Sequence, residues 1–137
     1  MLTTLILSPE LRAQFAAQAC AAFPRECCGL IEGVYDGGAV RALALHPTAN
    51  FSEDPNNFEI DPSAHLRLIR ALRGSGREIV GCYHSHPRGL PQPSGRDVEQ
   101  GGSDGFVWLI AALSGAAAAP GFSAFEGADF HPLAVSD

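Results

Sequence analysis

The sequence predicts an α/β (α+β) fold: a mixed, mainly antiparallel β-sheet sandwich flanked by two main helices, with a short third helix after a proline-rich loop. Three observations support this prediction. Apolar, β-leaning segments outnumber segments with helical periodicity. Glycine- and proline-rich turns separate these segments. One helical segment precedes the strands and one interrupts them, so the regular βαβ alternation of a parallel sheet is missing.

The first third of the chain is predicted to form a strand, a helix and a hairpin. Residues 2–7 have strand composition, and Ser8 with Pro9 has the cap and first-turn proline of a helix. Residues 27–34 and 39–45 are β-like and are joined by Asp36-Gly37-Gly38, a hairpin signal. The helix is expected to bury an apolar stripe at helical spacing: Leu11, Phe15, Ala19, Ala22 and Phe23.

The middle of the chain is predicted to form a loop and then the second helix. Residues 46–57 are polar, contain two prolines, and are expected to form a loop near the site. Asp61-Pro62 has the pattern of a helix start, and Gly74-Ser75-Gly76 that of a helix end. We expect the inward face of this helix to carry Leu68, Ile69 and Leu72.

The remaining strands follow the second helix. Residues 78–83 are apolar and β-leaning, and residues 106–113 are a strong candidate for a buried strand. Two weaker strands are expected at 121–126 and 129–135. Since no repeat or linker interrupts the pattern, residues 1–137 are predicted to form a single domain.

Composition excludes several classes of function. A net charge of −6 and the lack of a basic run argue against nucleic acid and anionic membranes as partners. No apolar run approaches the roughly 20 residues of a membrane span, and no signal peptide is evident, so a soluble, cytoplasmic protein is expected. All nine basic residues are arginines. A chain without lysine offers no side-chain amine for conjugation, so it would process conjugates rather than accept them.

The four cysteines do not form a CxxC zinc pattern, and reduced, buried thiols are the default expectation. One alternative concerns Cys28 and Cys82. Each lies two residues from a proposed site residue, Glu26 or His84. If both regions are extended and converge, the two thiols would lie close together beneath the site, where they could form a disulfide or act in redox chemistry.

The most informative segment is His84-Ser85-His86-Pro87. If the strand at 78–83 continues through it, His84 and His86 project to the same face, with Cα atoms roughly 6.6 Å apart. Two imidazoles so placed can both reach one ion at roughly 2.0–2.1 Å. A histidine pair of this kind is also compatible with a purely structural role.

Ser94 and Asp97 follow the histidines after three prolines. A short helix can begin at Ser94 and run to about Gln100, which would let Asp97 point back as a third metal ligand. The same spacing is that of a helix cap with a carboxylate three residues on, which needs no metal. The two roles are compatible with one another.

Taken together, these residues resemble the signature of the JAMM metalloprotease family, also called MPN+ or JAB1/Mov34/PAD-1. The pattern consists of His84-Ser85-His86-Pro87, six further residues, and Ser-x-x-Asp with Pro93 before the serine. The family's upstream glutamate context is also matched, by Pro24-Arg25-Glu26-Cys27-Cys28-Gly29-Leu30. Asn50 and the segment Phe58-Glu59-Ile60-Asp61-Pro62 are similar to the family's middle section. The resemblance covers about residues 1 to 115 and suggests a small prokaryotic-type member.

The resemblance implies a cytidine-deaminase-like JAB/MPN core and a zinc-dependent isopeptidase or peptidase. His84, His86 and Asp97 would hold Zn²⁺ and leave a fourth position open for water, as catalytic zinc sites do. Glu26 would act as general base and Ser94 as oxyanion donor. The implied substrate is the C-terminal tail of a ubiquitin-like or sulfur-carrier-like small protein.

A second hypothesis is a metal-free scaffold of the same fold, which would serve as an interaction module without catalysis. It predicts that the purified protein contains no stoichiometric zinc. Three further histidines, His46, His65 and His131, are expected to have no catalytic role, since two precede prolines and His65 is on the polar side of a helix.

Overall fold

The computed structural model describes residues 2–54, 58–87, 104–114 and 119–137. Two helices and seven strands lie in these ranges. In chain order they are β1 (Thr4–Ile6), α1 (Pro9–Ala22), β2 (Cys28–Asp36), β3 (Ala39–Thr48), α2 (Pro62–Leu72), β4 (Glu78–His86), β5 (Val107–Ala112), β6 (Gly121–Glu126) and β7 (His131–Ser136).

The seven strands form one closed barrel in the order β1-β3-β2-β4-β5-β6-β7. The ring closes because β1 pairs in parallel with the strand on each side of it, so that Leu5 lies opposite both Val40 and Val135. The predicted sandwich is therefore wrong, whereas the mixed, mainly sheet architecture with two helices is confirmed. The pairs β2–β3, β2–β4, β5–β6 and β6–β7 are antiparallel, and β1–β3, β1–β7 and β4–β5 are parallel.

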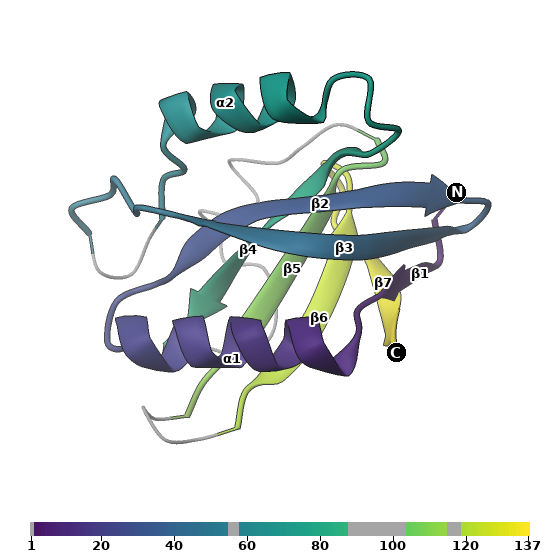
Figure 1. Cartoon of the computed structure of the whole chain (residues 1–137). Coiled ribbons are helices and arrows are strands. Elements are labelled where there is room, and N and C mark those ends of the chain that lie inside the picture. Colours follow the sequence, from purple (N-terminus) through teal and green to yellow (C-terminus); the bar gives the residue numbers. More distant parts are fainter. Residues whose placement is uncertain (1, 55–57, 88–103, 115–118) are drawn as a thin grey trace.

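Helix α1 packs against the main hydrophobic core, and Figure 1 shows the sheet lying between α1 and α2. The predicted cap is present, with Ser8 Oγ accepting a hydrogen bond of 3.2 Å from Leu11 N. Leu11 and Phe15 enter a core to which all seven strands contribute side chains. The expected stripe is confirmed for these two residues and Ala19, whereas the last two residues of the stripe are only half-buried.

Helix α2 covers a second core on the other side of β2, β4, β5 and β6. Asp61 caps it by accepting a hydrogen bond of 2.8 Å from Ser63 N, and Gly74 follows its end at a φ of 79°. Leu68 is buried and Leu72 packs partly against this core. Ile69 is 44% exposed, so its predicted inward position is wrong. A single helix lying on the outside of a barrel buries only a narrow stripe, and Ile69 falls beside it.

The hairpin between β2 and β3 is confirmed, with Gly37 at a φ of 61°. Strand β3 continues to Thr48, which pairs with Cys28, so the loop expected from residue 46 begins later than predicted. The short helix expected after Ser94 lies outside the described residues. Within the described ranges, neither helix has the length and apolar character needed to cross a membrane.

Candidate metal centre and active site

The last residues of β4 bring two imidazole rings together. The strand runs through His84 and His86, pairing with β2 on one side and with β5 on the other. The two side chains project to the same face, as the alternation of a strand requires. Their Nε2 atoms lie 3.0 Å apart. Both residues are buried, His84 completely.

This geometry fits two ligands of one metal ion. Two nitrogen atoms bound at 2.0–2.1 Å to a tetrahedral zinc are about 3.3 Å apart, close to the observed separation. Imidazole is also a donor that zinc prefers. The described residues contain no group of three His, Cys, Asp or Glu side chains that could hold a metal. Asp97, the predicted third ligand, and Ser94, the predicted oxyanion donor, lie outside the described residues.

Aromatic side chains fix the ring of His84. Phe58 stacks on it, with ring centroids 4.2 Å apart and planes inclined by 18°. Trp108 of β5 meets it edge to face at 6.4 Å. Both aromatic residues are buried. A ligand whose ring is held in this way needs little reorganisation to bind a metal, and the apolar surroundings limit access of water.

Glu26 lies at the same end of the sheet as the histidines. In the antiparallel register of β2 and β4, Cys28 is opposite His84, and Ser85 N donates to Cys27 O at 3.1 Å. Extending this register by two residues beyond the Cys28–His84 pair would bring Glu26 level with His86. Glu26 is 6% exposed. Its segment alone would suggest an exposed acid after a helix, whereas the hydrogen bonds between Cys27 and Ser85 bring this segment against β4.

Two further side chains hold the main chain at Glu26. Asn50 Nδ2 donates a hydrogen bond of 3.1 Å to Glu26 O, and Ser85 Oγ accepts one of 2.9 Å from Cys27 N. Both residues belong to motifs in the sequence, but no role was predicted for either. The one available signal was their position inside those motifs, because hydrogen bonds to the main chain leave no pattern in composition or spacing.

Comparison with known proteins identifies the family. Residues 8–125 match the model of Prok-JAB, described as prokaryotic homologs of the JAB domain. The chain belongs to this family. The resemblance to JAMM/MPN proteins predicted from the motifs is thereby confirmed.

This Prok-JAB chain has curated relatives with named activities. It is 34% identical over 114 residues to a desampylase of Haloferax volcanii. The match covers 82% of this chain and 78% of that protein. It is 33% identical over 95 residues to a probable TtuB-protein conjugate cleaving protease of Thermus thermophilus. That match covers 69% of this chain and 58% of the Thermus protein, so the chain spans little more than half of it.

The fold also has a counterpart among solved structures. The crystal structure of AF2198, a JAB1/MPN domain protein from Archaeoglobus fulgidus, superposes with a TM-score of 0.59. The superposition covers 99% of this chain and all of that one, at 16% identity. At this identity the likeness concerns the fold alone. It confirms the JAB/MPN core that the motifs implied.

Two cysteines near the histidine pair, Cys27 and Cys28, are unsuited to act as nucleophiles in this Prok-JAB chain. Burial raises the pKa of Cys27 to about 11 and also raises the pKa of Cys28, so both thiols stay protonated at neutral pH. Cys28 and Cys82 lie in the same core. These two residues form no disulfide, so that part of the alternative is not supported, and a redox role stays a prediction.

A second polar cluster stands apart from the histidine pair. The buried carboxylate of Glu32 accepts hydrogen bonds from Arg77 Nη1 at 2.9 Å and pairs with His46 Nε2 at 2.8 Å. Arg77, followed by His46, holds the pKa of Glu32 below its ordinary value. The absence of a catalytic role for His46 stays a prediction, and a structural ion pair is consistent with it.

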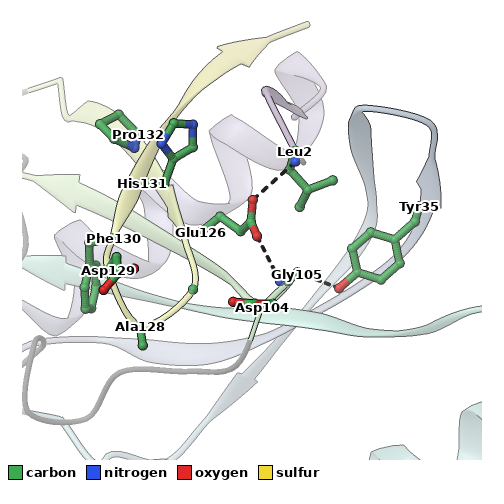
Figure 2. A pocket seen from close by; sticks show the side chains of 11 residues that line it. Leu2, Tyr35, Asp104, Gly105, Glu126, Ala128, Asp129, Phe130, His131 and Pro132 are labelled. Carbon is green, nitrogen blue, oxygen red and sulfur yellow. Dashed lines mark hydrogen bonds between the residues drawn. The ribbon is translucent and has the colours of Figure 1, made fainter.

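A cavity of about 740 Å³ lies at the far end of the strands. Figure 2 shows Glu126 among its lining residues, with one carboxylate oxygen accepting from Leu2 N at 3.3 Å and the other from Gly105 N at 3.0 Å. His86 pairs with Ala112, the last residue of β5, whereas Gly105 of the cavity lies just before the first residue of that strand. Since β5 spans roughly 16 Å, the cavity does not belong to the histidine pair. Among its lining residues, the carboxylate of Glu126 is already occupied by main-chain donors.

Proposed function

We propose that this Prok-JAB protein is a zinc-dependent isopeptidase or peptidase. It would hydrolyse an amide bond at the C-terminal tail of a ubiquitin-like or sulfur-carrier-like protein or peptide. The observation that carries the proposal is the facing pair of Nε2 atoms of His84 and His86, 3.0 Å apart, at the sheet end where Glu26 is buried. A metal-binding pair beside a buried carboxylate is what hydrolysis by an activated water requires.

The relatives support the reaction class and the kind of substrate. One is named a desampylase and another a probable protease that cleaves TtuB-protein conjugates. Both names describe removal of a protein modifier, which is hydrolysis of an amide or isopeptide bond. The lack of lysine in this chain agrees with a protein that processes conjugates and does not accept them.

We propose that His84, His86 and Asp97 hold the zinc ion. When bound, zinc lowers the pKa of a water molecule to about 7, which provides a nucleophile at neutral pH. Three protein ligands would leave one position open, the arrangement of catalytic zinc sites. Phe58 and Trp108 keep the ring of His84 in place and limit the water around it.

The remaining residues would manage protons and charge. Glu26 would take a proton from the water molecule as the water oxygen bonds to the scissile carbonyl carbon. The same proton would pass to the nitrogen of the leaving amine as the carbon–nitrogen bond breaks, a role worth about 10²–10⁴ in rate. The hydroxyl of Ser94 would donate to the carbonyl oxygen while it carries negative charge.

Incubation of the zinc-loaded protein with small ubiquitin-like proteins that carry C-terminal extensions tests the proposal. We expect mass spectrometry to show cleavage at the tail by the wild-type protein. Glu26→Ala should keep its zinc and lose hydrolysis. Bound zinc without cleavage of any candidate would instead favour small amide substrates, and purified protein without stoichiometric zinc would favour the metal-free scaffold.

A further inference from the structure

We propose that Asn50 and Ser85 act together as positioning residues for Glu26. Their side chains hold the two sides of one peptide unit, the one that joins Glu26 to Cys27. This inference rests on the proposed function, in which Glu26 is the base. We refer to the two hydrogen bonds, from Asn50 to Glu26 O and from Cys27 N to Ser85, as the Glu26 clamp.

The Glu26 clamp fixes the direction of a side chain through its main chain. The carbonyl group of the peptide unit is held by Asn50 Nδ2 and its N–H by Ser85 Oγ, at 3.1 Å and 2.9 Å. Rotation of this unit would change ψ of Glu26 and with it the direction of the carboxylate. A general base must lie within about 2.6–3.2 Å of the heavy atom that carries the proton it takes, and a misplacement of about 1 Å can cost 10²-fold in rate.

The chemistry of Asn50 suits a junction of three chain segments. Its Oδ1 accepts hydrogen bonds from Ser52 N at 2.9 Å and Glu59 N at 3.0 Å, while its Nδ2 donates to Glu26 O. An amide offers both an acceptor and a donor, whereas a carboxylate of the same shape can only accept. Glu59 follows Phe58, which stacks on His84. Asn50 therefore links the segment of the base to the segment that supports a metal ligand.

Ser85 connects the base to the metal ligands themselves. It is completely buried and lies between His84 and His86 in β4. Its N–H donates to Cys27 O at 3.1 Å, and its Oγ accepts from Cys27 N. The same residue thus sets the position of Glu26 relative to both imidazoles. The side chain of Ser85 lies on the face of the strand opposite the histidine rings, so it can position the base without binding the metal.

Steady-state kinetics with two complementary variants test this role. Ser85→Ala removes the acceptor without adding charge, and Asn50→Asp keeps the acceptor oxygen but removes the donor to Glu26 O. We expect kcat to fall about 10- to 100-fold in each, as when an outer partner of a metal site is lost, with KM and zinc content near wild type. Ser85→Thr, which keeps the hydroxyl, should restore most of kcat. Ser75→Ala, which removes a hydroxyl from the exposed turn after α2, is the control.

A double-mutant cycle separates positioning from general support of the fold. Both hydrogen bonds hold the same peptide unit, so kcat of the double variant should exceed the value expected from multiplying the two single effects. Independent contributions at two unrelated sites would multiply. Variants that keep wild-type kcat, or effects that multiply fully, would overturn the proposal.

Hydrogen exchange in the metal-free protein examines the Glu26 clamp without a substrate. The Cys27 amide should exchange at least about tenfold faster in Ser85→Ala than in the wild type, because its hydrogen-bond acceptor is gone. Unchanged exchange would contradict the geometry. An inactive wild-type protein overturns the proposed function itself, whereas active clamp variants beside an active wild type overturn only the positioning role.

Discussion

The Nε2 atoms of His84 and His86 face one another at 3.0 Å in the interior of the protein. Two buried imidazoles aimed at one point have a common use as ligands of a metal ion. Their position is set by β4, which is paired on both sides and is therefore rigid at this point. The pair can accept an ion without rearrangement of the main chain.

His84→Ala and His86→Ala should each abolish stoichiometric zinc binding. Loss of a direct ligand is expected to weaken affinity by more than the 10- to 100-fold that loss of an outer partner costs. Zinc content after dialysis and competition with a chelator measure the effect, with His65→Ala as control. Asp97→Ala should behave like the histidine variants. Wild-type affinity in Asp97→Ala would leave this residue as a helix cap only.

Phe58→Ala should affect both stability and zinc affinity. Phe58 is 3% exposed and stacks on His84, so its truncation should lower the free energy of unfolding by about 3–5 kcal/mol. Phe51, in the same loop, is 53% exposed. Phe51→Ala should change the free energy of unfolding by less than about 0.5 kcal/mol. Denaturant titration compares the two, and equal effects would refute the supporting role of Phe58.

Local signals explain the parts of the fold that the sequence predicts well. Ser8-Pro9 and Asp61-Pro62 begin the two helices because each places a capping oxygen before a proline that needs no hydrogen-bond partner. The common face of His84 and His86 follows from strand alternation alone. These properties depend on residues close in sequence.

Long-range pairing explains what the sequence does not predict. Closure of the barrel depends on the three residues of β1, which join β3 and β7 from distant parts of the chain. The exposure of Ile69 depends on where α2 rests on the barrel, since an isoleucine suits either side of an apolar stripe. The burial of Glu26 depends on its distant contact with β4, to which the next residue, Cys27, is hydrogen-bonded through Ser85. None of these leaves a periodic pattern.

The candidate site also contains residues that the sequence predicts and residues that it does not. The histidines and Glu26 carry distinctive side-chain chemistry, so their motifs make them visible in the sequence. The side chains of Asn50 and Ser85 form hydrogen bonds with main-chain groups. Many polar residues can form such bonds, so the sequence does not mark these two. The roles of Ser94 and Asp97 stay predictions.

Gly81→Ala should destabilise the protein through the contact between β4 and β5. A Cβ atom on Gly81 would collide with the carbonyl oxygen of Val107 and lie 2.9 Å from its Cα. Because the obstacle is main chain in a paired strand, we expect a loss of at least about 1–3 kcal/mol in the free energy of unfolding. A Cβ on Gly121 would meet nothing within 4 Å, so Gly121→Ala should be nearly neutral. A near-neutral Gly81→Ala would contradict this close approach.

Glu32→Gln should make stability less dependent on pH in the acid range. Arg77 and His46 lower the pKa of Glu32 from 4.5 in the folded protein. A lowered folded pKa means that the stabilisation is fully present above the unfolded value and is lost as pH falls through the folded one. The free-energy difference between wild type and Glu32→Gln should therefore be constant above about pH 4.5 and shrink on further acidification.

Urea unfolding between about pH 7 and about pH 3 measures this difference. A chelator should be present throughout, because protonation of the histidines would release metal and add a second source of pH dependence. Glu53→Gln, at an exposed position of the loop after β3, is the matched control. It should follow the wild type at every pH. If the advantage of the wild type over Glu32→Gln grows as the pH falls, the ion pair does not stabilise the folded state in the way that the contacts of Glu32 indicate.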